Sequence, residues 1–107
     1  MKLVIAIMNK NDANVVVDAL NEKGIQVTKL STAGGFLRSG NTTLLIGIEE
    51  HKVDQVISII SELSSERKQL MPNAIPPELG ISTMLPFEVT IGGATIFVLN
   101  IDRYKKV

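Results

Sequence analysis

The chain contains no cysteine and no tryptophan, and its basic and acidic residues cancel to a formal net charge of zero. Without cysteine it forms no disulfide, no zinc–thiolate site and no thiol nucleophile, and such a composition suits the reducing cytoplasm, where we expect the protein to be. The balance of charge argues against a broad surface for duplex nucleic acid and against a polybasic membrane patch. His51 is the single histidine, too little for a metal site or a catalytic triad.

The length of 107 residues fits one domain, and we expect residues 1–107 to form it. A chain this short buries a modest fraction of its surface, so association between copies is expected to add stability. The apolar run over residues 3–8 is too short to cross a membrane, and it predicts a strand rather than a membrane-inserted segment.

The first half of the chain predicts a strand, a helix and a β-hairpin. Residues 2–9 are a continuous apolar and β-branched run, typical of a central strand. A helix capped by Asn11 or Asp12 is expected to follow. Residues 25–30 and 42–48 then predict the two strands of the hairpin.

The second half predicts a helix, a long loop and two more strands. Residues 53–63 carry apolar side chains at helical spacing. Residues 64–86 hold all four prolines and show no period, which predicts a long loop. Residues 86–91 and 94–101 predict strands joined as a hairpin by the two glycines between them. The order indicates an α+β, ferredoxin-like βαββαβ sandwich with an extra C-terminal β-hairpin.

The segment between the first two hairpin strands carries the strongest functional signal. The Gly34-Gly35 pair lets backbone N–H groups converge on an anion, and Phe36 offers a flat face for stacking on a base. Arg38 supplies a planar fork for phosphate, and Asn41 can read a base edge. Each residue alone is as well explained by a turn, an interface or a solvated charge, but together they predict a site for a nucleotide-sized anion.

Three stretches of sequence carry a resemblance to a known family. VTKLSTAGGFLRSGNTT, residues 27–43, and EVTIGGATIFVL, residues 88–99, resemble the PII-like cyclic di-AMP receptors of the PstA or DarA type, as does the opening MKLVIAI. The resemblance implies a homotrimer of PII-like, ferredoxin-like subunits that binds cyclic di-AMP in clefts between neighbours. It also implies that the protein is not an enzyme, needs no cofactor or metal, and signals to a downstream protein through loops that rearrange on binding.

The resemblance assigns roles only at matching positions. The residues that it implies around the nucleotide are Thr28, Gly35, Phe36, Leu37, Asn41, Gly47 and Phe97, to which the residue chemistry adds Arg38. Three features depart from the family. Gln26 stands where a basic residue is usual, the loop over residues 71–85 is shorter, and the tail over residues 103–107 lacks the usual aromatic and glutamine pattern.

Three other function classes compete with this one. A small acyl-phosphate hydrolase of this fold would need a glycine-rich loop with arginine and asparagine near the N-terminus, and residues 8–12 offer none. An RNA-binding module would place aromatic side chains on central strands, yet the chain has three Phe and one Tyr, none of them on the first strand. The stronger rival is a trimeric PII-like or divalent-ion-tolerance-type protein that binds a different nucleotide or regulates a partner as a scaffold without cyclic di-AMP.

Overall fold

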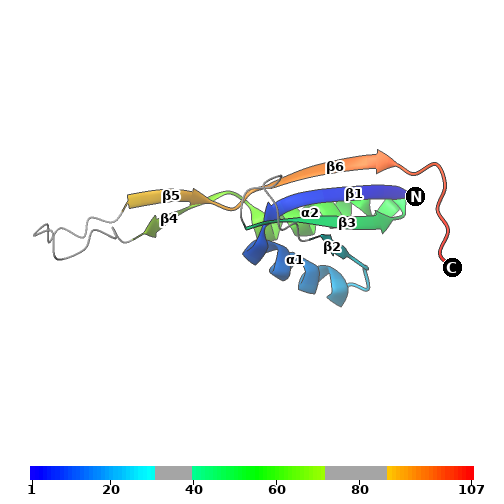
Figure 1. The fold of residues 1–107 in the computed structure, drawn as a ribbon, viewed down its shortest axis with the longest axis horizontal. Helices are drawn as coiled ribbons and strands as arrows, with labels where there is room; N and C mark the ends of the chain where they lie inside the picture. Colours follow the sequence, from blue (N-terminus) through cyan, green and yellow to red (C-terminus); the bar gives the residue numbers. More distant parts are fainter. Residues whose placement is uncertain (31–39, 72–86) are drawn as a thin grey trace, which may run out of the picture.

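The computed structural model describes residues 1–30, 40–71 and 87–107 (Figure 1). A short 3-10 turn, Glu50–Lys52, precedes the second helix. The helices and strands are β1 (Lys2–Asn9), α1 (Lys10–Glu22), β2 (Thr28–Leu30), β3 (Asn41–Ile48), α2 (Val53–Ser64), β4 (Arg67–Met71), β5 (Phe87–Ile91) and β6 (Ala94–Asn100).

Four strands form an antiparallel sheet in the order β2-β3-β1-β6. Both helices lie on one face of this sheet (Figure 1). This strand order, with helices on a single face, is the ferredoxin-like α+β arrangement and confirms the predicted fold class.

Alternating side chains of the central strands build the core between the sheet and the helices. Val4, Ala6 and Met8 of β1 are buried, whereas the residues between them are only partly so. The helices contribute apolar side chains at a spacing of three and four residues. The other buried members of the core are Ala13, Val16, Leu20, Ile25, Leu44, Ile46, Val53, Val56 and Ile60.

The predicted start of the first helix was two or three residues too late. Asn9 is the N-cap, and its side chain accepts a hydrogen bond from the Asp12 backbone N–H at 2.8 Å. The last residue of the apolar run therefore ends β1 and begins α1, with extended backbone at φ −68° and ψ 156°. The next strand begins at Thr28 rather than at Ile25, whose N–H still donates to the Leu20 carbonyl at the helix end.

The second half of the chain departs further from the prediction. Residues 67–71, expected in a loop, form β4, which pairs with β5 to make a separate two-stranded ribbon. β6 pairs with β1 instead of with β5, so the predicted C-terminal hairpin is wrong. Gly92 and Gly93, at φ +83° and +91°, carry the chain from the ribbon into the main sheet. We call the β4–β5 ribbon the arm; it projects from one end of the sandwich (Figure 1).

Candidate functional site

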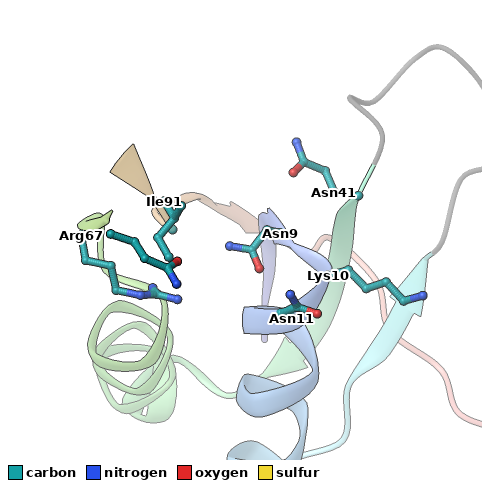
Figure 2. Close-up of a pocket in the computed structure, with 9 residues that line it drawn as sticks. Asn9, Lys10, Asn11, Asn41, Arg67 and Ile91 are labelled. Carbon is teal, nitrogen blue, oxygen red and sulfur yellow. The ribbon is translucent and has the colours of Figure 1, made fainter. Parts of the chain in front are cut away.

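A pocket lies at the end of the sandwich from which the arm leaves. At this end β1 finishes, α1 and β3 begin, and the chain leaves α2 for the arm. The pocket has a volume of about 550 Å³, within the usual range for small-molecule sites. Its lining residues are Asn9, Lys10, Asn11, Gly40, Asn41, Arg67, Gln69, Ile91 and Gly92 (Figure 2).

One wall of the pocket belongs to the sandwich. Asn9 and Asn41 are register partners at the ends of β1 and β3. The Lys10 backbone N–H donates to the Gly40 carbonyl at 2.6 Å, which ties the start of α1 to the start of β3. Gly40 has φ +93°, a conformation that suits glycine at the entry to the strand. These bonds hold Asn41 at a fixed place beside the pocket.

The opposite wall belongs to the arm. Arg67 and Ile91 are direct cross-strand partners, and Gln69 lies two residues further along the same face. Figure 2 shows the Arg67 guanidinium and the Asn9 amide extending toward each other across the pocket, while Lys10 points away to the far side. The pocket is therefore a space between two parts of the chain far apart in sequence, lined by amide side chains and by the Arg67 guanidinium.

An ion pair joins the two walls. Arg67 Nη2 donates to Asp12 Oδ1 at 2.8 Å, and Nη1 donates to Oδ2 at 3.2 Å. The hydrogen bond from Arg67 holds the pKa of Asp12 below its usual value, burial acts in the opposite direction, and a second hydrogen bond from Asn9 lowers it further. Asn9 Nδ2 donates that bond to Asp12 Oδ2 at 2.8 Å. Asp12 is thus an ionised carboxylate at neutral pH, with both oxygens occupied.

The predicted site residues divide into two groups. Gly35, Phe36, Leu37 and Arg38 lie in residues 31–39, outside the described part of the chain. Thr28, Asn41, Gly47 and Phe97 are described, and the register puts all four on the sheet face opposite the helices. Of these, only Asn41 lines the pocket.

The four described residues do not surround one point within a single chain. Phe97, Ile5, Leu45 and Thr28 form one row across the four strands. Phe97 and Thr28 are therefore three strand spacings apart, roughly 14 Å. Asn41 and Gly47 are six residues apart on β3, roughly 20 Å. The four residues are therefore spread over this sheet face rather than gathered around one pocket.

Sequence reasoning missed the cap at Asn9 and the ion pair beside the pocket. Asn9 and Asp12 have the spacing of an N-cap and the third helical residue, a recognisable capping signal that was assigned to the wrong residue. Arg67 gave no comparable signal, because its partner lies 55 residues away and its own segment was assigned to a loop.

Two features are absent from residues 1–30, 40–71 and 87–107. Over these ranges no group of three His, Cys, Asp or Glu side chains is placed to hold a metal ion. No helix among them has the length and apolar character needed to cross a membrane.

The fold and the pocket define a class: a ferredoxin-like α+β protein with a polar, ligand-sized space between its sandwich and an inserted arm. Comparison with family models narrows this class. The model described as "Cyclic-di-AMP receptor" matches residues 1–107, and the chain belongs to that family. The predicted resemblance to the cyclic di-AMP receptors is thereby confirmed.

A solved structure also resembles this chain. It is a protein of Pediococcus pentosaceus ATCC 25745 that is described as functionally unknown; it is 43% identical, and the match has a TM-score of 0.78. The match covers 99% of this chain and 96% of that one, so the two folds correspond over nearly their full length.

Proposed function

We propose that the protein is a non-catalytic receptor that binds cyclic di-AMP between the subunits of a homotrimer and signals through rearrangement of its loops. Family membership supports the ligand. The observation that carries the intersubunit site is the separation of the predicted ligand residues on one sheet face, with Thr28 at the β2 edge and Phe97 at the β6 edge.

The character of that face supports assembly. On it Phe97 is 50% exposed, Leu99 45% and Leu30 42%, and none of the described elements covers them. Exposed apolar side chains in a continuous sheet face favour contact with another protein surface. In a closed three-fold ring the β6 edge of one copy would meet the β2 edge of the next, and Phe97 and Thr28 of different copies would then flank one cleft.

The chemistry of the described residues suits a dinucleotide. Asn41 carries both a donor and an acceptor for a base edge, and the Thr28 hydroxyl can bond a phosphate or ribose oxygen. Gly47 lacks a side chain that would keep a base from the strand. The residues of the 31–39 segment would supply stacking and phosphate contacts, as the sequence predicts. We also propose a cytoplasmic location and a downstream protein partner contacted near the arm.

Gln26 favours a second candidate. A family member that lacks the usual basic residue here loses one charge for a phosphate, which would suit a different nucleotide, or a scaffold role without nucleotide. This alternative keeps the trimer and changes only the ligand.

The two candidates are separated by calorimetric titration of the protein with cyclic di-AMP, ATP, cyclic AMP and AMP, accompanied by light scattering. We expect a trimer that binds cyclic di-AMP more tightly than any mononucleotide. Equal or tighter binding of ATP would support the alternative, and a monomer at micromolar concentration would remove the intersubunit site.

A further inference from the structure

The arm needs an anchor to hold a fixed position relative to the sandwich. Its two strands pair with each other and with no other strand among the described residues. A two-stranded ribbon alone is marginally stable in water, and the described residues of this one include no buried side chain. The orientation of the arm therefore depends on the contacts at its base.

The ion pair between Arg67 and Asp12 is the charged contact at the base of the arm. Asp12 belongs to the first turn of α1, and only 5% of its surface is exposed. The fork of Arg67 engages both carboxylate oxygens, a geometry that combines charge with fixed orientation. A buried carboxylate deprived of such a partner is costly, so Asp12 favours the arm position in which Arg67 reaches it.

The glycine junction is shaped around the same guanidinium. A Cβ on Gly92 would lie 2.5 Å from Arg67 Nη1 and 2.6 Å from the Ser65 carbonyl oxygen, too close for any side chain. Arg67 Nη1 also donates to that carbonyl at 3.1 Å. Beside it the Gly93 N–H donates to the Ser64 carbonyl at 2.5 Å, which closes the base of the arm against the end of α2.

We propose that Arg67 is a positioning residue of the nucleotide site: its fork on Asp12 latches the arm so that Gln69 and Ile91 face Asn41 across the pocket. This inference rests on the proposed function for the identity of the ligand. We call the ion pair of Arg67 with Asp12 the latch. It fixes the position of Gln69 and Ile91, which would contact cyclic di-AMP bound beside Asn41. A chain with a free arm presents these residues for only part of the time, and its apparent affinity falls by the same fraction.

The test measures the arm and the ligand separately. Hydrogen exchange and calorimetry with cyclic di-AMP compare the wild type with four variants: Arg67→Met, Arg67→Lys, Asp12→Asn and the double variant that combines Asp12→Asn with Arg67→Met. Lys68→Met is the matched control: it removes a cation from the next residue, whose contact with Glu88 at 3.8 Å is solvent-exposed. The double variant leaves no unpaired charge, so it tests the latch even if Arg67→Met folds poorly.

We expect Arg67→Met to speed exchange of the arm amides by about tenfold or more, the loss typical of a hydrogen bond to a charged group, with β1 and β3 unchanged. Cyclic di-AMP should bind about three- to tenfold more weakly, with Arg67→Lys between wild type and Arg67→Met. The double variant should be no worse than Arg67→Met, because both disrupt one interaction.

Three results would overturn parts of this reading, each distinguishable from the others. If the arm amides exchange no faster in Arg67→Met than in Lys68→Met, Arg67 does not anchor the arm. Faster arm exchange with unchanged affinity would leave an anchor but refute the positioning role. Failure of the wild type to bind cyclic di-AMP would refute both the proposed function and the positioning role. The exchange data would still show whether the Arg67–Asp12 ion pair anchors the arm.

Discussion

The sandwich and the arm are built on different physical principles. In the sandwich, β1, β3 and both helices enclose a core of buried apolar side chains, and burial of apolar area dominates its stability. The described part of the arm has no buried side chain and is held by its own strand ladder, one ion pair and a two-glycine junction. Substitutions in the sandwich should therefore change global stability, whereas those at the base of the arm should change a local conformation and the site beside it.

The largest difference is expected between a core leucine and an arm leucine. Leu20 is completely buried between α1 and the sheet, so Leu20→Ala should lower the free energy of unfolding by about 2–5 kcal/mol. Leu70 in β4 is 64% exposed, and Leu70→Ala should change it by less than about 0.5 kcal/mol. Urea unfolding at one fixed protein concentration measures both. Similar losses for the two variants would contradict the distinction between the regions.

Gly92 and Gly93 provide a matched pair of positions at the base of the arm. Gly93→Ala should lower the free energy of unfolding by about 1–2 kcal/mol, because φ +91° is unfavourable for alanine. The nearest atoms are 3.8 Å or more from a new Cβ, so no collision adds to this loss. Gly92→Ala adds the collision with Arg67 and the Ser65 carbonyl, so it should cost more and should loosen the arm. Hydrogen exchange of β4 and β5, read beside urea unfolding, compares them. Identical arm exchange in the two variants would mean that crowding at Gly92 does not position the guanidinium.

The two regions also differ in how far the sequence predicted them. The apolar run of β1 and the helical spacing in α2 are local patterns, and both elements were predicted within a few residues. β4 was missed because its partner β5 follows a proline-containing segment, and pairing across such a gap leaves no local period. Gly92-Gly93 was assigned to a hairpin because positive φ serves a hairpin turn and a junction between sheets equally well.

The same limit applied to the site. Asn41 was predicted as a ligand residue, and the structure places it at the pocket, while its contact with a base stays a prediction. Thr28 and Phe97 were predicted from resemblance, but their positions at opposite sheet edges follow from strand order, which residue types do not encode. The contact of Asp12 with Arg67 depends on how the chain returns after α2, so no spacing in the sequence indicated it.

Substitution of Phe36 should change the affinity for cyclic di-AMP and leave the free energy of unfolding nearly unchanged. Phe36→Ala should weaken binding of cyclic di-AMP by about 1–3 kcal/mol, the usual contribution of a base stacked on an aromatic ring. The free energy of unfolding should change little, because the predicted role of Phe36 is in the ligand site and not in the core. Calorimetry and urea unfolding on one preparation measure the two quantities. Unchanged affinity would remove Phe36 from the site, and a large loss of stability would assign it to the core instead.

The smallest expected effect is the share of the pH dependence of the free energy of unfolding that comes from Asp12. Arg67 lowers the pKa of Asp12 in the folded protein below its ordinary value of 3.8, so in that interval the unfolded chain binds more protons than the folded one. The contribution of Asp12 to stability is therefore complete above the ordinary pKa and is lost as pH falls through the lowered one. Urea unfolding from pH 6 downward should show an acid loss that is smaller in Asp12→Asn than in wild type. An acid loss in Asp12→Asn equal to that of wild type would show that other carboxylates, and not the arm's anchor, respond to the proton.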